Sequence, residues 1–306
     1  MKKFVFVFLL LMASAWCADA QKSVSTDSDM KAFTALNVSD EFTVTLRKSD
    51  DYVLKTNIDE RLDPFVVAYV KDGVLYLDID RKKMTPELKK ALRSNHGKAA
   101  VIEAEVLVPY LNVMEISGDV FVKSTDGFET DSFRLNASDK SVIENLEMVC
   151  RTAELNVSKS ASVDLTVSAS SFLNLKTSGS SKTFIRQNGD FLTVTSSGTS
   201  QIEAVVDVKS LEVNNSGMSN VTVVSGKAGD LKVDASGSSK FKAADVPVPS
   251  AYMIQSGSSK SIVYATDTLK VNLVGNSVLE FKENPYIDLE KIVSSTLTRY
   301  DGTSSK

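Results

Sequence analysis

The sequence has few of the residues that metal sites and histidine-based catalysis need: its 306 residues include one histidine, two cysteines and one tryptophan. Structural zinc sites use four Cys or His ligands, and a catalytic triad needs a histidine held between two partners. We therefore expect no metal site, no cofactor and no catalytic residue of these kinds. His96 lies near the end of a candidate surface helix, where a cation suits the helix terminus, and we assign it no catalytic role.

An excess of charge of one sign is absent as well. The chain has 35 Lys and Arg against 39 Asp and Glu, which gives a formal net charge of −4 at pH 7. Because nucleic-acid binding relies on basic residues that neutralise phosphates, we expect no nucleic-acid partner. Beyond the N-terminal segment, no apolar run approaches the roughly 18 residues of a membrane-spanning helix, so we expect no transmembrane span. The hydrophobic content of 42% is ample for a folded core.

The first 20 residues have the organisation of a cleaved signal peptide. Lys2 and Lys3 give a positive start, residues 4–12 are uninterrupted and apolar, and residues 18–20 read Ala-Asp-Ala, the pattern that signal peptidase cleaves. We predict cleavage after Ala20, so that the mature chain begins at Gln21. The protein would then be located in the periplasm, at the outer membrane or outside the cell.

The two cysteines have different predicted fates. Cys17 lies directly behind the apolar run, which leaves a lipoprotein as an alternative, although the bulky Trp16 before it argues against lipid attachment. Signal cleavage would remove Cys17 and leave Cys150 without a disulfide partner in the chain. We interpret Cys150 as a small, buried hydrophobic residue rather than a reactive thiol.

The second half of the sequence is a repeat with a period of about 20 residues. Segments of the pattern Leu-x-x-x-x-Ser-Gly begin at residues 173, 192, 211 and 231, and related copies begin at residues 112, 133, 155, 252 and 269. The glycines that close these segments are Gly118, Gly179, Gly198, Gly217, Gly237, Gly257 and Gly275. In two early copies, Asp139 and Ala161 replace the glycine.

Each repeat has the pattern of a strand, a tight turn and a second strand. Apolar and polar residues alternate, as in Leu211 and Val213 before the turn and Val221 and Val223 after it. Glycine adopts turn angles that other residues resist, and the neighbouring serines can hydrogen-bond the backbone. A unit of about 20 residues cannot bury its own apolar face, so neighbouring units must stack.

We therefore predict an all-β fold, a right-handed β-solenoid similar to a parallel β-helix, with coils of about 20 residues over residues 111–284. The alternative is an antiparallel meander that closes into a barrel or sandwich. The near-constant repeat length and the recurrence of Ser-Gly at one position favour the solenoid.

The flanking segments are predicted separately. Residues 32–110 would form a strand-rich N-terminal part, with a hairpin turn at Asp72-Gly73 and a helical insertion at about residues 85–96 that begins at Thr85 and Pro86. Residues 21–31, rich in Ser, Thr and Asp, are expected to be a flexible lead-in. Residues 285–306 are expected to be a C-terminal cap or tail.

An ordered series of motifs resembles a known bacterial family, the putative auto-transporter adhesin, head GIN domain family. The series comprises the signal peptide, Phe33-x-x-Leu36-x-Val38, Asp72-Gly73 before Leu75-Tyr-Leu, Val106-Leu-Val-Pro109-x-Leu111, Ser117-Gly118 and the Ser-Gly repeats. The resemblance covers roughly residues 32–282. An insertion at residues 81–100 and the replacements at Asp139 and Ala161 depart from the family pattern.

The resemblance implies a β-solenoid protein of the envelope or the medium, found mostly in gut and environmental bacteria of the Bacteroides type. It implies no reaction, because the family has no agreed catalytic residues, and we therefore transfer no site from it. A shared fold is weak evidence for a shared function.

Enzymes built on parallel β-helices need clustered carboxylates, which stacking would create from acids that recur at one position of the repeat. Glu212 and Asp234 lie in neighbouring repeats but at different positions. We therefore predict that the protein is not an enzyme. A polysaccharide-active lyase or hydrolase is kept as an alternative.

Two surfaces are candidates for binding. Lys182, Lys240 and Lys260 each follow a Ser-Gly-Ser-Ser turn and would form a ladder of positive charge along one edge, which either protects that edge or contacts an anionic glycan or surface polymer. The second surface is a polar sheet face that would contain Thr193, Glu212, Lys232 and Lys270.

The leading functional interpretation is a non-catalytic, exported envelope protein that acts as an adhesin-like binding or scaffold module. Its partner would be a glycan or a surface protein of the envelope or the host. A purely structural component of an envelope assembly is a further alternative. The oligomeric state is left open.

Overall fold

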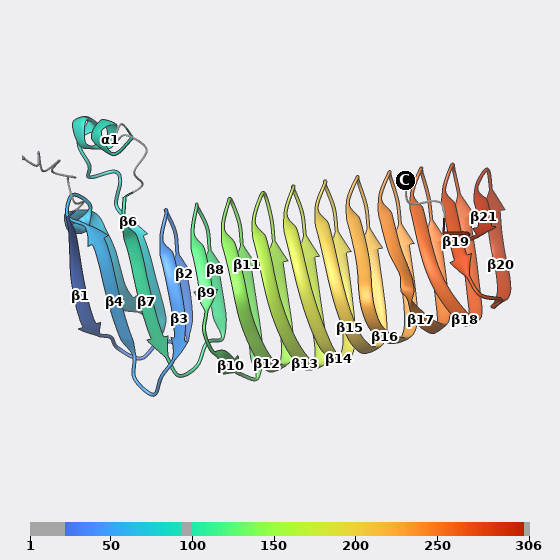
Figure 1. Ribbon diagram of the computed structural model, residues 1–306, viewed down its shortest axis with the longest axis horizontal. Coiled ribbons are helices and arrows are strands. Elements are labelled where there is room, and N and C mark those ends of the chain that lie inside the picture. The colour runs from blue at the N-terminus through green and yellow to red at the C-terminus, as the bar shows by residue number, and fades with distance from the viewer. Residues whose placement is uncertain (1–21, 94–99, 303–306) are drawn as a thin grey trace, which may run out of the picture.

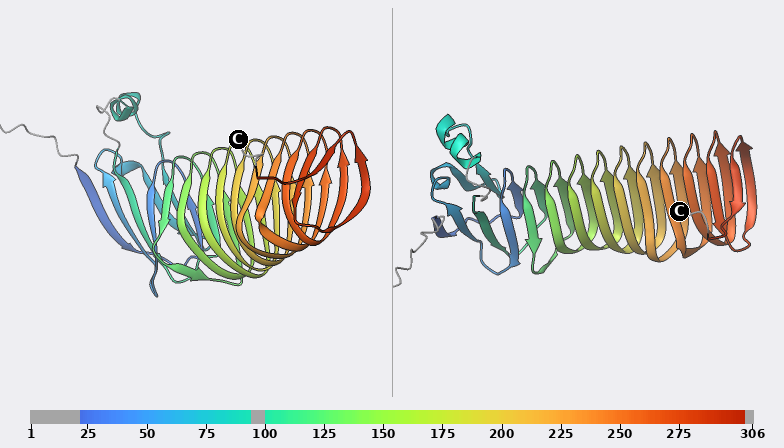
Figure 2. Two further views of the ribbon diagram at one scale, coloured as in Figure 1. Left: turned by 45° about the vertical axis from the view of Figure 1, so that its right-hand side comes forward. Right: turned by 45° about the horizontal axis from the view of Figure 1, so that its top comes forward.

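The computed structural model describes residues 22–93 and 100–302. The predictions on the signal peptide, on Cys17 and on His96 lie outside these residues. The described chain is a β-solenoid, an elongated stack of parallel coils, with one short helix that projects from the stack near its N-terminal end (Figures 1 and 2). The helix packs Leu88 and Leu92 against the core. The fold class predicted from the repeat is confirmed, and the barrel and sandwich alternatives are excluded.

The elements before the repeats are the strands β1 (Ser23–Asp29), β2 (Ala35–Val38), β3 (Thr43–Lys48), β4 (Val53–Asp59), β5 (Val66–Lys71), β6 (Val74–Ile79) and β7 (Ile102–Val108), the 3-10 helix η1 (Asp63–Phe65) and the helix α1 (Pro86–Arg93). Four shorter strands open the repeats: β8 (Val113–Ile116), β9 (Phe121–Ser124), β10 (Gly127–Glu129) and β11 (Ser132–Ala137).

Long strands make up the central coils: β12 (Val142–Val157), β13 (Ser162–Thr177), β14 (Lys182–Ser196), β15 (Gln201–Asn215), β16 (Asn220–Ala235), β17 (Lys240–Gln255) and β18 (Lys260–Val274). The last strands are β19 (Val278–Lys282), β20 (Tyr286–Val293) and β21 (Thr296–Arg299).

Each long strand bends near its middle and contributes to both sheets of the flattened solenoid. Its first half follows a tight turn and its second half leads into the next tight turn, so the solenoid has two different edges. We call the row of tight turns the turn edge and the row of bends the bend edge; they lie at the top and bottom of Figure 1 respectively. The bends contain register shifts, as between Ala169 and Phe172 where β13 pairs with β14.

Neighbouring coils pair in parallel and in register, so equivalent residues of the repeat stack on one another. Leu192, Leu211 and Leu231 are consecutive partners, and all three are buried. Rows of this kind form the continuous apolar core between the two sheets. Because the side chains of a strand alternate between its two faces, the residues between the leucines and valines face solvent.

The turn edge is a column of residues in the left-handed region of φ. Gly179, Gly198, Gly217, Gly237, Gly257 and Gly275 have φ between 69° and 81°, and Gly118 has φ of 86°. Stacking restricts this position further: a Cβ atom on Gly198 would lie 2.6 Å from the carbonyl oxygen of Gly179. Glycine is therefore favoured both by the turn angle and by the coil beneath.

One of the two early repeat assignments without glycine needs correction. Asp139 does occupy the turn position, with φ of 66°, but Ala161 does not. The turn residue of that coil is Lys159, with φ of 59°. Val157 pairs with Thr177, which lies two residues before the turn residue Gly179, so the equivalent turn residue lies two residues after Val157. Ala161 is a buried residue after the turn.

Buried serines tie the two sides of the turns together. Ser200, Ser219 and Ser239 are fully buried two residues after the turn glycine. The Ser200 hydroxyl donates to the carbonyl oxygen of Ser197 (2.9 Å), and the Ser219 hydroxyl donates to that of Ser216 (2.6 Å). These bonds satisfy polar groups that the stack has removed from water.

The N-terminal part also contains coils, which the sequence did not reveal. β2 pairs in parallel with β8, and β3 pairs in parallel with β9. β6 pairs in parallel with β2, and β7 with β3. The coil of β2 and β3 therefore lies between the coil of β6 and β7 and the coil of β8 and β9, so the spatial order differs from the chain order.

Antiparallel strands close the N-terminal end of the stack. β4 pairs antiparallel with β7, and β5 pairs antiparallel with β6 through the predicted turn at Asp72-Gly73. β1 then pairs antiparallel with β4 over all its seven residues. The expectation of a flexible lead-in at residues 21–31 is corrected for this segment, because the free edge of β4 supplies backbone partners to a polar sequence.

The two other flanking predictions were a helical insertion at about residues 85–96 and a C-terminal cap or tail at residues 285–306. The helix α1 begins where expected, and the Leu88 backbone N–H donates to the hydroxyl of the N-cap Thr85 (3.2 Å). At the C-terminal end, β20 pairs in parallel with β18 and β21 with β19. The described part of residues 285–306 is therefore a further coil of the solenoid, in place of a separate cap or tail. No helix among the described residues is long and apolar enough to cross a membrane.

The turn column gives a test of what stacking adds to the requirement for glycine. We expect Gly198→Ala to lower the free energy of unfolding by about 3 kcal/mol, because the alanine Cβ adds a clash with Gly179 to the cost of a left-handed residue. Gly73→Ala is the matched control, since Gly73 has φ of 74° and no atom within 4 Å of its added Cβ. It should cost about 1 kcal/mol. Urea unfolding followed by circular dichroism measures both, and equal losses would show that stacking adds nothing.

Candidate functional site

The three lysines expected to form a ladder are exposed at the turn edge and occupy one position of the coil. Strand register places Lys182, Gln201, Asn220, Lys240 and Lys260 as consecutive partners. Lys240 and Lys260 are therefore neighbours, whereas two uncharged residues separate them from Lys182. The positive ladder is reduced to one adjacent pair and one isolated lysine.

The expected polar sheet face is also brought together. Thr193, Glu212 and Lys232 are consecutive partners in register, and Lys270 follows after one intervening residue. Most of its charges are paired within the face: Lys232 Nζ lies 2.9 Å from Glu212 Oε1.

The pKa of Lys232 is raised by its hydrogen bond to Glu212, and the pKa of Lys270 is raised in the same way by Glu290, whose Oε1 lies 2.7 Å from the ammonium. Exposed pairs of this kind contribute little to stability, about 0–1 kcal/mol each. They leave a face with alternating charges and little net charge.

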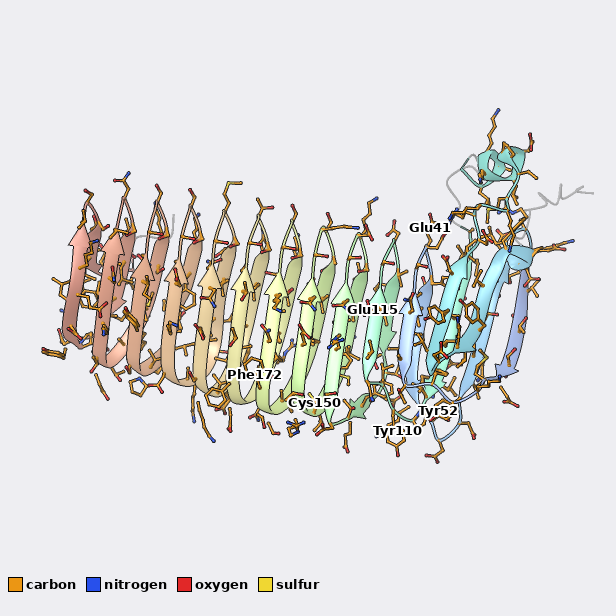
Figure 3. All side chains as sticks on the ribbon, turned by 180° about the vertical axis from the view of Figure 1, so that it is seen from behind. Glu41, Tyr52, Tyr110, Glu115, Cys150 and Phe172 are labelled. Atoms are coloured by element: carbon orange, nitrogen blue, oxygen red, sulfur yellow. The ribbon has the colours of Figure 1, made fainter. Side chains whose placement is uncertain are left out.

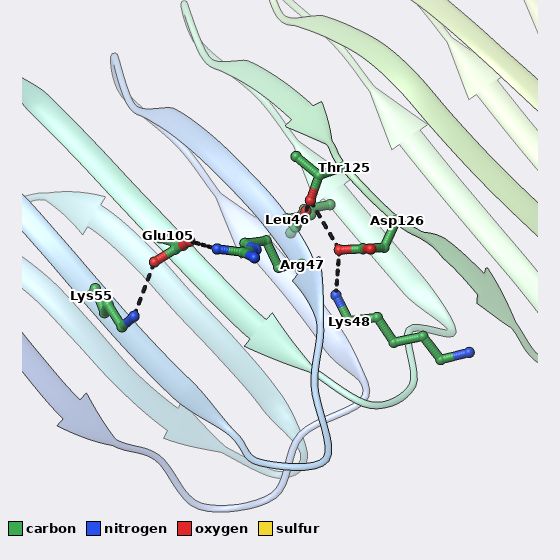
Figure 4. A network of polar contacts seen from close by, with 7 residues as sticks. All are labelled: Leu46, Arg47, Lys48, Lys55, Glu105, Thr125 and Asp126. Carbon is green, nitrogen blue, oxygen red and sulfur yellow. Dashed lines mark hydrogen bonds and ion pairs between the residues drawn. The ribbon is translucent and has the colours of Figure 1, made fainter.

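A polar groove of about 610 Å³ crosses the outer face of β1, β4, β7 and β3 at the N-terminal end. Its floor includes the acids Asp27, Glu103 and Glu105, which come from separate parts of the sequence. Arg47 and Lys55 form ion pairs with Glu105 at 3.0 and 3.2 Å, and they hold the pKa of this carboxyl below its usual value. Figure 4 shows both ion pairs.

Beside this groove, Asp126 accepts hydrogen bonds from the Lys48 backbone N–H (3.1 Å) and from the Thr125 hydroxyl (2.9 Å). These bonds lower the pKa of Asp126, so its carboxylate is charged and fully engaged in local structure. The network joins the end of β3 to the loop after β9 and stabilises the crossing of the coils there.

A second polar pocket lies on the turn edge near the insertion. Arg81 makes ion pairs with Asp40 (2.5 Å) and Glu41 (3.1 Å), and Lys159 lies 2.6 Å from Asp139. Asp40, Asp139 and Lys159 occupy the column that glycine fills in the later coils, so their side chains add charge where the other turns have none.

The bend edge contains a third pocket, of about 740 Å³, to which four successive coils contribute. Arg151 binds Asp131 in a bidentate manner, with Nε and Nη2 at 2.8 and 2.9 Å from the two carboxylate oxygens, and this lowers the pKa of Asp131. The remaining lining residues are Glu129, Thr130, Val149, Cys150, Ser168, Ser170, Asn188 and Gly189.

Exposed apolar side chains accompany this pocket. Phe172 is 39% exposed and Phe191 is 51% exposed, and the two are partners on neighbouring strands. Figure 3 shows Phe172, Cys150 and Tyr110 along the bend edge. Sequence reasoning missed this edge. The one signal was that a phenylalanine directly precedes the leucine that opens two repeats, at Leu173 and Leu192.

Metal-binding chemistry has no evident site in the described part of the chain. Residues 22–93 and 100–302 contain no group of three or more His, Cys, Asp or Glu side chains placed to hold an ion. Cys150 is 5% exposed, as expected of a small core residue, and burial raises the pKa of its thiol to about 11.

Comparison with known proteins gives one family and a set of related structures. The sequence model of the family described as "Putative auto-transporter adhesin, head GIN domain" matches residues 32–170 and again residues 149–285. No curated protein matches the chain.

Three solved structures are similar over nearly the whole chain. A putative adhesin from Parabacteroides distasonis has a TM-score of 0.51 and 18% identity, and the match covers 91% of this chain and 97% of that one. A putative adhesin from Parabacteroides merdae has a TM-score of 0.48 and 16% identity, with 91% and 96% covered. A putative lipid binding protein from Parabacteroides distasonis has a TM-score of 0.47 and 17% identity, with 91% and 96% covered. At these identities the first structure shows a shared fold.

The environment of Cys150 predicts a thiol that reacts slowly. Because burial disfavours the thiolate, the native mature chain should react with a disulfide reagent at pH 8 roughly 100-fold more slowly than the chain unfolded in guanidinium, whose thiol has an ordinary pKa of about 8.5. The native rate should rise about tenfold per pH unit and level off only above the thiol pKa of about 11. Similar rates for the native and unfolded chains would show that the bend edge opens readily at Cys150.

Proposed function

The chain belongs to the family putative auto-transporter adhesin, head GIN domain, and from this membership we propose that it is an exported, non-catalytic binding protein of the bacterial cell envelope. The observation that carries the proposal is the continuous stack of coils from β6 to β21, which repeats each surface position along the rod. A rod of this kind can contact a repetitive polymer at several points at once, and such contacts multiply affinity when the spacing fits.

The proposed partner is a glycan or a surface protein of the envelope or the host. At the turn edge, the adjacent Lys240 and Lys260 would contribute a contact for an anionic polymer. The residues that flank this pair in the column, Asn220 and Val278, are uncharged. Neither of these strand neighbours can therefore form an ion pair with Lys240 or Lys260. Two neighbouring free ammonium groups suit a chain of sulfates or carboxylates.

A polysaccharide-active enzyme is less well supported. Such an enzyme needs a carboxyl with a raised pKa as its general acid, close to a second carboxylate. The N-terminal groove does gather acids, but Arg47 and Lys55 lower the pKa of Glu105, and Glu103 accepts a hydrogen bond from the Asn57 amide (2.9 Å). These contacts favour a structural role for the acids of the groove.

Binding to an anionic polymer gives a test of the function. Purified mature chain should bind immobilised polygalacturonate or chondroitin sulfate at 50 mM salt, and Lys240→Ala combined with Lys260→Ala should raise the Kd about fivefold, because two exposed charges are lost. Lys182→Ala is the matched control, since its neighbouring coils contain no lysine at this position, and it should change the Kd less than twofold.

Equal effects of the single and double variants would argue against the lysine pair as the contact. The wider proposal is tested by the wild-type chain on immobilised glycan and envelope-protein arrays. A lack of binding above background on every array would contradict a binding function and would favour a purely structural component of an envelope assembly.

Export is tested by the mature N-terminus. Mass spectrometry of the protein isolated from fractionated producing cells should give a chain that begins at Gln21, in the periplasm, the outer-membrane fraction or the medium. A chain that begins at a lipidated Cys17 would contradict cleavage after Ala20. It would fix the rod to a membrane and make an envelope scaffold the better interpretation.

A further inference from the structure

Exposed apolar side chains are concentrated on the bend edge. Phe172 and Tyr110 are exposed there (Figure 3), and Tyr110 is 58% exposed. Phe191, the strand partner of Phe172, and Val149, which lines the pocket at this edge, are exposed as well. At the turn edge of the described coils, the exposed large hydrophobic residues are Met218 and, directly before the last turn, Val293. Single exposed apolar residues are ordinary, but a row of them along one edge of a rod marks a contact surface.

Phe172 and Phe191 form the centre of this row. They are partners in the parallel pairing of β13 with β14, so their Cα atoms are separated by about one strand spacing, roughly 4.8 Å. Each directly precedes a buried leucine, Leu173 or Leu192, whose side chain faces the core. The phenylalanines therefore lie on the outside of the bend, where burial in the core does not account for them.

The pocket at the bend edge adjoins this row and is polar. Its hydroxyl, amide and charged side chains offer both donors and acceptors, including Ser168, Ser170 and Asn188. Its only cationic lining residue, Arg151, is held by Asp131 in a bidentate pair, and Glu129 adds a further negative charge. The lining thus disfavours an anion and suits a neutral ligand rich in hydroxyl groups.

We propose that the bend edge between residues 129 and 191 binds a neutral saccharide chain. This proposal rests on the binding function above and adds to it a site and a ligand class that are separate from the turn-edge lysines. The rings of Phe172 and Phe191 would pack against the apolar faces of sugar rings, while Ser170, Asn188 and Arg151 would hydrogen-bond sugar hydroxyls. A few polar groups beside aromatic surface is the usual composition of a small-molecule site, here extended over four coils.

The test is affinity electrophoresis of the full mature chain in gels that contain amylopectin, mannan or xyloglucan. At least one of these neutral polysaccharides should retard the wild-type protein. Phe172→Ala combined with Phe191→Ala should raise the Kd about tenfold or more, because the stacking surface is removed. Asn188→Ala, which removes one polar contact, should raise it about threefold.

Met218→Ala is the matched control, because Met218 is 66% exposed but lies on the turn edge. It should leave the Kd unchanged within twofold. Circular dichroism and urea unfolding should show that all variants fold as the wild type does, since the replaced side chains are exposed.

Several outcomes would overturn the proposal. The first is no retardation of the wild-type chain in any of the three gels, and the second is an equal effect of Met218→Ala and the double phenylalanine variant. The third is that the double phenylalanine variant loses binding only to envelope-protein arrays, which would assign the row to a protein partner. If the wild-type chain binds the glycan or protein arrays and the double phenylalanine variant binds them equally, this inference fails while the binding function stands.

Discussion

In-register stacking of parallel coils is the constraint on which the rest of the structure depends. Each coil provides the hydrogen-bond partners of the next, so every residue lies one strand spacing from the residue at the same position of the neighbouring coil. An apolar position becomes a buried row, and a left-handed turn becomes a column in which Gly198 touches the carbonyl group of Gly179. A position that is favourable in one coil is therefore favourable in all of them, which makes the repeat visible in the sequence.

The same constraint explains which parts of the fold were predictable. The coils closed by Gly179 to Gly275 were recognised because stacking imposes the same residue at the same position in each. The coils of β2 with β3 and β6 with β7 were not recognised, because an antiparallel excursion and the insertion that contains α1 interrupt them and their spatial order differs from the chain order. The turn at Lys159 was misplaced because Leu155-x-Val157 has the pattern that starts a repeat, whereas the residue that pairs with the start of the next repeat, Leu173, is Ala153, two residues earlier.

The candidate site was predicted less well, for a related physical reason. The bends accommodate register shifts, which fall between Cys150 and Thr152 in one coil, between Ala169 and Phe172 in the next and between Ala204 and Val205 further on. Alignment is lost at these shifts, and where it is kept the residue type changes, since Phe172 pairs with Phe191 but Phe191 pairs with Ser210, so no motif recurs there. The sequence placed the three turn-edge lysines at one position of the repeat. That two uncharged residues separate Lys182 from Lys240 at this position follows only from the strand register.

The two edges therefore have different freedom to change. At the turn edge, φ and the close contact between coils restrict the residue to glycine or, towards the ends of the stack, to a few residues such as Asp139 and Ser294 that adopt the left-handed region. The bends have no equivalent column, and side chains as different as Ser168, Asn188 and Phe191 are accommodated there. A surface that specifies one ligand must vary among related rods without disturbing the stack, and the bend edge meets that requirement. For this physical reason we place specificity at the bends and stability at the turns.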